Sequence, residues 1–325
     1  MKNAFNITEF TDGILSSNIS YVSKAITLVE STKHEHQEQA QQIINAIIQH
    51  SGKSFRLGIT GVPGVGKSTF IESFGLEVIE RGHKLAVLAI DPSSQLSKGS
   101  ILGDKTRMEQ LSIHPKAFIR PSPSSGSLGG VARKTKESII ICEAAGYDYI
   151  LVETVGVGQS ETAVHQLTDF FLLLMLAGAG DELQGIKRGI MEMADGMVIT
   201  KADGTNLDKA KMARREYANA LHLFPPTESN WIPEVLTCSS TENKGIKEVY
   251  DMIDKYKRHT IANGFFESKR DHQSTQWLHQ TIHDMLIDRF YADPNMKTEI
   301  QKIENRLKQN AVNPYQAVMD LFKKT

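Results

Sequence analysis

The sequence predicts an α/β fold with a mostly parallel central sheet and additional helices before and after it. A glycine-rich octet, GVPGVGKS, occupies positions 61–68 between a short apolar strand and an amphipathic helix. From residue 55 to about 260, apolar strand-like runs alternate with helical patterns, as in parallel sheets covered on both faces. The flanking segments carry apolar residues at helical spacing.

The octet has the spacing of a phosphate-binding loop. Gly61, Gly64 and Gly66 allow backbone N–H groups to turn inward around phosphate oxygens. The N-terminus of the following helix adds partial positive charge. Lys67 can reach the β- and γ-phosphates, and the hydroxyl of Ser68 can bind Mg²⁺. The alternative, a glycine-rich turn that carries Lys-Ser by chance, is disfavoured by the strand before the octet and the helix after it.

Three regions follow from the pattern along the chain. We expect an N-terminal helical extension at 1–50, a P-loop domain at 51–262 and a C-terminal helical region at 263–325. The expected strands are 55–60, 85–90, 117–120, 148–153, 170–176, 196–200 and 235–238. The expected helices between them are 67–81, 130–145, 206–221 and 245–258. The C-terminal region has an apolar stripe that either packs on the core or serves self-association, formed by Trp277, Leu278, Ile282, Met285, Leu286 and Phe290.

Composition argues against several classes of protein. Hydrophobic residues make up 40% of the 325, and the longest apolar run, 170–179, is roughly half of a membrane span. The N-terminus lacks the apolar stretch of a secretory signal, so we expect a cytoplasmic protein without a membrane partner. A net charge of −1 gives no general attraction for nucleic acid. Cys142 and Cys238 are expected to be buried thiols in a reducing compartment.

Acidic residues on the polar segments after two of the strands are candidates for holding a metal. The strand 85–90 ends in Asp91, and we expect it to lie beside the phosphate strand, so that the carboxylate reaches Mg²⁺ or its water. A turn aspartate before Pro92 is the alternative. The polar segment 91–116 is too long for an ordinary connection, and Asp104 within it is a second metal candidate.

The next strand ends in a pattern typical of nucleotide switches. Glu153 is followed three residues later by Gly156, as in the DxxG turn whose glycine N–H contacts the γ-phosphate. Because Glu replaces the usual Asp, its carboxylate reaches the metal either directly or through a water. Gln159 is a candidate for orienting the attacking water and Glu161 for stabilising the loop. A plain polar loop is the alternative for both.

The strand 196–200 leads into a pattern for guanine recognition, Thr200-Lys201-Ala202-Asp203. The carboxylate of Asp203 can accept hydrogen bonds from guanine N1–H and N2–H₂, which adenine does not supply. The stem of Lys201 can lie on the plane of the base. After the strand 235–238, backbone N–H groups in the stretch Ser239 to Thr241 can meet guanine O6. These features predict GTP rather than ATP as the nucleotide.

Several long runs are far more specific than these short patterns. They are AITLVES (25–31), GVPGVGKST (61–69), AIDPSS (89–94), GSILGDKTRM (99–108), RPSPSSGSLGGVA (120–132), VETVGVGQSE (152–161) and GAGDELQGIKRGIMEMAD (178–195). Together they resemble one family, the methylmalonyl-CoA mutase-associated G-protein chaperones, also called MeaB/ArgK-type GTPases. Some members carry an older label as lysine/arginine/ornithine (LAO/AO) transport ATPases. The resemblance is strong over about 23–260 and loose over the C-terminal helices.

The resemblance implies a homodimeric GTPase with GTP or GDP and Mg²⁺ as ligands. It implies binding to an adenosylcobalamin-dependent acyl-CoA mutase, gating of cofactor loading, and protection of the mutase from inactivation. The segment 178–188 then corresponds to an additional switch that faces the mutase, and the C-terminal helices correspond to a dimerisation arm.

By position, the resemblance also assigns site residues. The phosphates are held by Gly61, Val62, Pro63, Gly64, Val65, Gly66, Lys67, Ser68 and Thr69. The Mg²⁺ shell is Ser68, Asp91, Asp104 and Glu153, and catalysis is assigned to Lys67, Asp91, Glu153 and Gln159. The base is read by Lys201, Asp203, Ser239, Ser240 and Thr241.

One departure from the family pattern bears on the site, and two other functions stay open. Thr200 stands where Asn is usual, which is expected to lose an amide able to bridge to the phosphate loop. The alternatives are a kinase or ATPase coupled to basic amino-acid transport and a GTPase that delivers nickel or another metal. The first lacks a membrane segment in this sequence, and the second lacks a His-rich tract or Cys/His pair.

Overall fold

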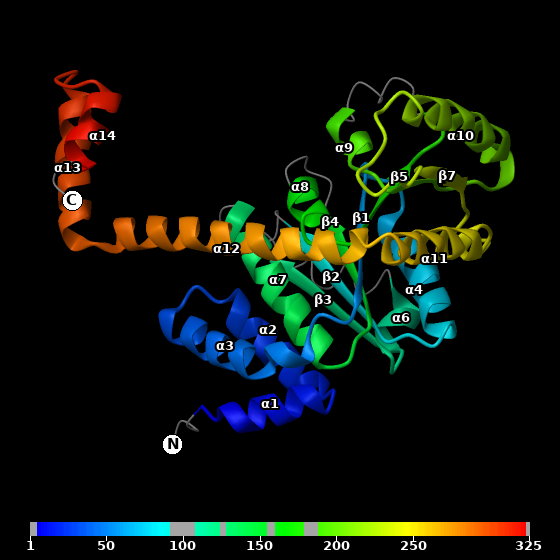
Figure 1. The fold of residues 1–325 in the computed structure, drawn as a ribbon, viewed down its shortest axis with the longest axis horizontal. Coiled ribbons are helices and arrows are strands. Elements are labelled where there is room, and N and C mark those ends of the chain that lie inside the picture. The colour runs from blue at the N-terminus through cyan, green and yellow to red at the C-terminus, as the bar shows by residue number, and fades with distance from the viewer. Residues whose placement is uncertain (1–4, 92–107, 124–127, 155–159, 179–187, 323–325) are drawn as a thin grey trace. The chain divides into compact units, whose positions relative to one another are not determined.

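The computed structural model describes residues 5–91, 108–123, 128–154, 160–178 and 188–322. They form two compact units, Met1–Gln273 and Ser274–Thr325. Figure 1 shows the ribbon with the elements labelled in chain order. Among the described residues, no helix is both long enough and apolar enough to cross a membrane. Both cysteines are buried free thiols, as predicted.

The first unit is built on a seven-stranded sheet in which all the paired strands run parallel (Figure 1). The strands are β1 (Phe55–Gly61), β2 (Leu85–Asp91), β3 (Ala117–Pro123), β4 (Tyr149–Thr154), β5 (Phe170–Met175), β6 (Gly196–Ile199) and β7 (Glu234–Thr237). Every residue of β1, β4 and β5 is buried, as expected for strands covered on both faces. The predicted fold class and the seven predicted strands are confirmed.

Helices cover both faces of this sheet. They are α4 (Lys67–Glu80), α6 (Glu109–Ile113), α7 (Leu128–Ala144), α8 (Ser160–His165), α9 (Arg188–Glu192), α10 (Leu207–Leu221) and α11 (Ile246–Ala262), with single turns η1 (Ile48–His50) and η3 (Gly204–Asn206). Leu57 of β1 packs in one core with Phe74 of α4, whereas Leu173 of β5 packs in another with Tyr217 of α10. Because side chains alternate along a strand, α4 and α10 lie on opposite faces of the sheet.

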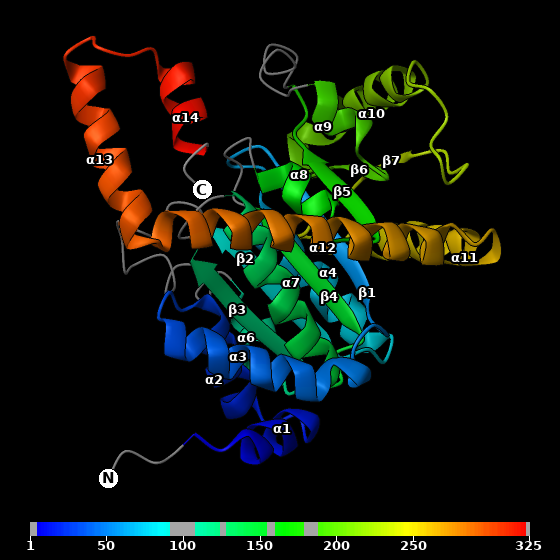
Figure 2. The same ribbon diagram turned by 60° about the vertical axis from the view of Figure 1, so that its left-hand side comes forward.

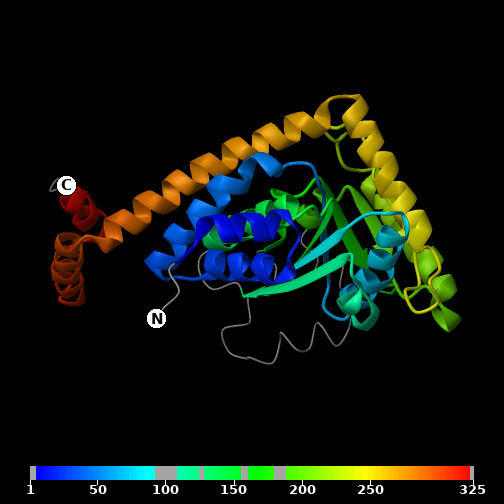
Figure 3. The same ribbon diagram turned by 90° about the horizontal axis from the view of Figure 1, so that it is seen from below.

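Three N-terminal helices pack as a group against α7 (Figure 2). They are α1 (Ile7–Leu15), α2 (Ile19–Glu30) and α3 (His34–Ile47). The side chains of Asn6 and Asn18 cap α1 and α2 by accepting hydrogen bonds from backbone N–H groups of the first turns. Figure 3 shows this group and α4 on opposite sides of the sheet.

The strand order corrects one expectation. The order is β3-β2-β4-β1-β5-β6-β7, so β4 separates β2 from the phosphate strand β1. Asp91 therefore does not end the strand beside the phosphate strand; Glu153 and Thr154 do. The expectation was wrong because similar apolar runs form all the central strands, and no single run encodes which strands are neighbours. The backbone of Asp91 ends β2, and its side chain lies outside the described part of the structure.

The helix α12 (Phe265–Ala292) begins in the first unit, where its first two turns bind the connection between α8 and β5. The guanidinium of Arg270 donates to both carboxylate oxygens of Asp169, at 2.7 and 2.6 Å, and also to the carbonyl of Ser54 at 2.6 Å. The carboxylate of Asp169 accepts a further 2.7 Å bond from the N–H of Arg56 in β1. We call Asp169 and Arg270, with their partners, the Asp169 clamp.

The second unit contains the rest of α12, then α13 (Pro294–Lys308) and α14 (Pro314–Phe322). Asp293 caps α13, and Pro294 occupies its first position. The rings of Phe290 and Phe322 stack with centroids 5.3 Å apart, which ties α12 to α14. Four members of the predicted apolar stripe are exposed, namely Leu278, Ile282, Met285 and Leu286.

Candidate nucleotide site

The phosphate loop connects β1 to α4, the strand–turn–helix context that the sequence predicts. Gly64 and Gly66 have φ angles of 77° and 90°, a left-handed backbone that residues with a Cβ rarely adopt. Gly66 is also the N-cap of α4 and provides no side-chain hydrogen bond to it. The first N–H groups of α4 are therefore available to an anion at the positive end of the helix.

The side chain of Lys67 folds back over the phosphate loop. Its ammonium donates to the carbonyl of Gly61 at 2.8 Å and, more weakly, to that of Val62 at 3.5 Å. Burial lowers the pKa of Lys67, and the charges of Glu153 and Glu161 oppose that shift. Charge-assisted bonds to phosphate oxygens are stronger than bonds to neutral carbonyls, so an arriving phosphate is able to replace these carbonyls as the partner of the ammonium.

Two acids are buried near this lysine. Glu153, at the end of β4, is 5% exposed, and Glu161, in the first turn of α8, is 4% exposed. Next to Glu153, the hydroxyl of Thr154 donates to that of Thr60 at 2.8 Å, which joins β4 to β1 at their carboxyl ends. Carboxylate and hydroxyl oxygens are the ligands that Mg²⁺ prefers, so Glu153 and Ser68 at this edge fit a magnesium ion.

The predicted base-reading residues come together after the carboxyl ends of the adjacent parallel strands β6 and β7. Oδ2 of Asp203 accepts from the hydroxyl of Ser239 at 2.5 Å and from that of Thr241 at 3.3 Å. The backbone of Lys201 is left-handed, with φ of 54°, and Asn206 donates to its carbonyl at 2.7 Å. These two bonds fix the orientation of the Asp203 carboxylate, and neither of them uses its other oxygen, Oδ1.

Contacts join the predicted base-reading residues to the phosphate loop. The hydroxyl of Thr200, which is 2% exposed, donates to the carbonyl of Val65 at 2.7 Å and lies 3.3 Å from that of Met175. Thr200 lacks the amide of the usual Asn, as expected, but its buried hydroxyl makes a bridge to the phosphate loop in place of that amide. The stem of Lys201 also runs beside Gly66, with Cε 3.8 Å from where a Cβ would stand.

Part of the predicted site lies outside the described residues. This applies to Asp104, to Gln159, to most of the segment 178–188 and to the side chain of Asp91. Sequence reasoning missed Ser73, whose hydroxyl donates to the carbonyl of Ser240 at 2.9 Å. Its position inside α4 gives no pattern that distinguishes it from an ordinary helical serine.

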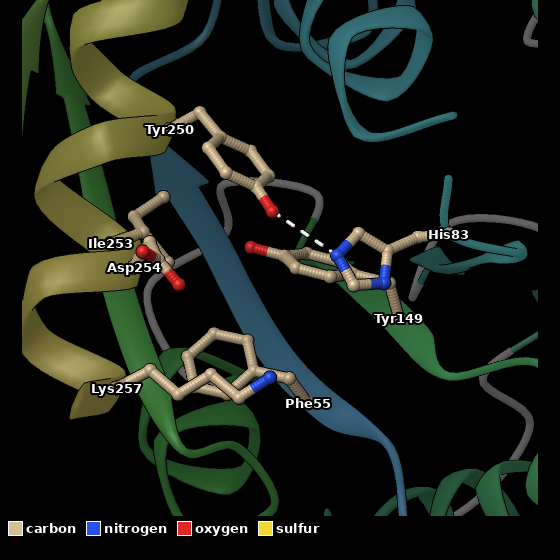
Figure 4. A pocket seen from close by; sticks show the side chains of 7 residues that line it. All are labelled: Phe55, His83, Tyr149, Tyr250, Ile253, Asp254 and Lys257. Carbon is tan, nitrogen blue, oxygen red and sulfur yellow. Dashed lines mark hydrogen bonds between the residues drawn. The ribbon is translucent and has the colours of Figure 1, made fainter. Parts of the chain in front are cut away.

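A small hollow at the opposite, amino ends of β1 and β4 is unsuited to a nucleotide. Its lining includes Phe55, Tyr149, His83 and Tyr250, and the last two share a 3.1 Å hydrogen bond (Figure 4). Burial raises the pKa of Tyr149, whose hydroxyl has no protein partner among the described residues. The space fits about one water molecule, which would satisfy that hydroxyl.

A strand–loop–helix phosphate site joined to an oriented Lys-x-Asp base loop on a parallel sheet defines the class of P-loop GTPases. The sequence model of the family described as "Methylmalonyl Co-A mutase-associated GTPase MeaB" matches residues 22–295. The chain belongs to this family, and its enzymatic activity is the hydrolysis of GTP.

Relatives agree with this membership over almost the whole chain. A "Probable GTPase" of Mycobacterium tuberculosis is 48% identical over 300 residues, which are 92% of this chain and 89% of the relative. The "Methylmalonic aciduria type A homolog, mitochondrial" of Mus musculus is 44% identical over 96% of this chain and 77% of its own length. The crystal structure of a "LAO/AO transport system kinase" matches over 100% of both chains, with a TM-score of 0.78 and 36% identity.

Proposed function

We propose that this GTPase is the chaperone of an adenosylcobalamin-dependent acyl-CoA mutase of the methylmalonyl-CoA type. Its nucleotide state gates the loading of adenosylcobalamin and protects the mutase from inactivation. Support comes from the family's description as mutase-associated and from the mouse relative, which is named for methylmalonic aciduria. The structural observation that carries the proposal is the oriented carboxylate of Asp203 beside the phosphate loop, which suits a guanine-specific switch.

In this proposal the base and phosphates are bound by separate groups. Asp203 accepts from guanine N1–H and N2–H₂, the stem of Lys201 lies on the base, and the backbone N–H groups of Ser240 and Thr241 meet O6. The N–H of Ser239 does not take the predicted part in this contact, because it donates to the carbonyl of Lys244 at 2.9 Å. The backbone from Gly61 to Thr69 surrounds the phosphates. Lys67 leaves the carbonyl of Gly61 and binds the β- and γ-phosphates.

The proposed metal ligands are Ser68, Asp91, Asp104 and Glu153. When bound, Mg²⁺ neutralises charge that develops on the phosphate oxygens during hydrolysis. Two observations support Glu153 as a metal ligand: it lies near the carboxyl end of β4, the strand next to β1, and it is buried close to Lys67. Gln159 is proposed to orient the attacking water.

The second unit is proposed to hold two copies of the chain together. Leu278, Ile282, Met285 and Leu286 are 58%, 47%, 54% and 62% exposed and recur along one face of α12. A second copy of the same face would remove this apolar surface from water. Leu286→Lys should then shift the protein from dimer to monomer in analytical ultracentrifugation, while Lys302→Ala on α13 should not. A wild-type monomer at micromolar concentration would refute this part.

The central test is a comparison of nucleotides with and without the mutase. GTP and ATP affinities and hydrolysis rates are measured on the purified chain, then repeated with an adenosylcobalamin-dependent acyl-CoA mutase. We expect strong preference for GTP and a change in affinity or rate when the mutase is present. A preference for ATP, with transfer of its γ-phosphate to a solute-binding protein, would instead support a transport kinase, the activity for which the related crystal structure is named.

A further inference from the structure

Ser73 connects the helix after the phosphate loop to the loop assigned to the base. It lies on α4, partly buried, less than two turns beyond Lys67. Its hydroxyl donates to the carbonyl of Ser240 at 2.9 Å and lies 3.3 Å from the carbonyl of Thr69 in its own helix. A helical serine most often bonds only within its helix, whereas this one has an acceptor 167 positions away.

The bond to Ser240 sets the direction of a neighbouring N–H group. The carbonyl of Ser240 and the N–H of Thr241 belong to one peptide unit, and the described residues contain no cis peptide bond. In a planar trans unit the C=O and N–H point in opposite directions. With the carbonyl turned toward α4, the N–H of Thr241 is turned away from that helix.

That N–H is also available to a ligand. Among the described residues, no hydrogen bond from the backbone N–H of Ser240 or Thr241 is found. The next N–H along the chain, that of Glu242, instead donates to the hydroxyl of Ser239 at 3.2 Å. The same hydroxyl donates to Asp203, so the two available donors lie in the loop that orients the base-reading carboxylate.

We propose that Ser73 is a positioning residue for guanine recognition. Its hydroxyl holds the carbonyl of Ser240 so that the N–H of Thr241 donates to O6 of the base. This inference rests on the proposed base site, in which Asp203 reads the N1–H and N2–H₂ edge. The N-terminus of α4 lies at the phosphate loop, and Ser73 lies on the same helix. One helix would therefore contribute to the phosphate site and also orient the donor for the base.

The test varies the protein and the base together. Dissociation constants of GTP, of ITP, which keeps O6 but lacks the 2-amino group, and of 2-aminopurine riboside triphosphate, which lacks O6, are measured for wild type and Ser73→Ala. We expect Ser73→Ala to weaken GTP and ITP equally, by about 3- to 10-fold, and to leave the 2-aminopurine nucleotide within twofold of wild type. Ser73→Thr, which keeps a hydroxyl, should retain most of the GTP affinity.

Controls separate failure of this inference from failure of the base site. Ser112→Ala, which removes a hydroxyl bonded only to its own helix, should change none of the three constants. Equal weakening of all three nucleotides by Ser73→Ala, or no weakening of GTP, would overturn the role of Ser73. If wild type binds the 2-aminopurine nucleotide as tightly as GTP, the proposed base site itself is wrong.

Discussion

The hydroxyl of Thr200 donates a 2.7 Å hydrogen bond to the carbonyl of Val65, which places the start of the base-reading motif directly on the phosphate loop. Both residues are buried, so this bond is shielded from competing water. The loops proposed to bind the two halves of a nucleotide thus already contact each other. Little rearrangement is then required to bring base and phosphate contacts together.

Removing this hydroxyl should weaken nucleotide binding. In Thr200→Val the shape of the side chain is kept and the buried carbonyl of Val65 loses this donor, so we expect the dissociation constant of GTP to rise about 5- to 30-fold. Thr200→Ser keeps the donor and should stay within threefold of wild type. Calorimetric titration of both variants with GTP measures this. Equal affinities for Thr200→Val and wild type would show that the bridge does not support the site.

The base preference should change in Asp203→Asn. The hydroxyls of Ser239 and Thr241 donate to Oδ2, so the asparagine is expected to turn its carbonyl oxygen toward them and its NH₂ toward the base. An amide donor suits the 2-carbonyl of xanthine and not the 2-amino group of guanine. We expect about 10²-fold weaker GTP and tighter xanthosine triphosphate. Competition binding of the two nucleotides measures the exchange, and weaker GTP without tighter xanthosine triphosphate would contradict the assigned role.

The Asp169 clamp should be a major determinant of stability. The side chains of Asp169 and Arg270 are 1% and 14% exposed, so Arg270→Met leaves a buried carboxylate without its charged partner. Such a loss costs about 3–5 kcal/mol of unfolding free energy. Urea unfolding measures it.

The matched control for the clamp is an exposed ion pair. Nζ of Lys302 lies 2.7 Å from Oε1 of Glu299, and the two side chains are 65% and 22% exposed. Lys302→Ala should therefore lower the unfolding free energy by less than about 1 kcal/mol. If Arg270→Met costs no more than this control, the clamp does not secure the start of α12.

Acid should destabilise the region of α8 through His165. Burial, with a smaller contribution from Lys269, lowers the pKa of His165 to about 4 from its ordinary 6.5. Between these values the unfolded chain binds a proton that the folded chain excludes, so stability falls as the pH falls from about 6.5 to about 4. The full effect of this pKa difference is about 3 kcal/mol. The unfolding free energy of His165→Gln should depend less steeply on pH in this window than that of wild type, and identical slopes would contradict the assignment.

Much of the fold could be predicted because its elements are locally encoded. The continuous apolar runs of β1, β4 and β5 indicate strands buried on both faces, and the glycines of 61–66 indicate a phosphate loop whatever surrounds them. The order of the strands in the sheet was harder to predict from the sequence, because it depends on which strands and helices pack together in the folded chain. The expected neighbour of the phosphate strand was therefore wrong.

The site shows the same division between local patterns and contacts made in space. Asp203 belongs to a recognisable motif, and its place beside Ser239 follows from the carboxyl ends of adjacent parallel strands. The bond from Ser73 to Ser240 and that from Thr200 to Val65 join residues more than a hundred positions apart. The first bond has no motif of its own. For the second, the motif marks the position of Thr200, and only the folded chain reveals that its hydroxyl reaches Val65.

The most direct test of the proposed function is the transfer of adenosylcobalamin to an apo-mutase in the presence of this protein. Transfer is followed by the absorbance change of the cofactor with GTP, with GDP and without nucleotide, for wild type and for Lys67→Ala. We predict that the extent or rate of loading differs between GTP and GDP with wild type, and that Lys67→Ala abolishes the difference. Loading that is the same in all three nucleotide states with wild type would contradict the account.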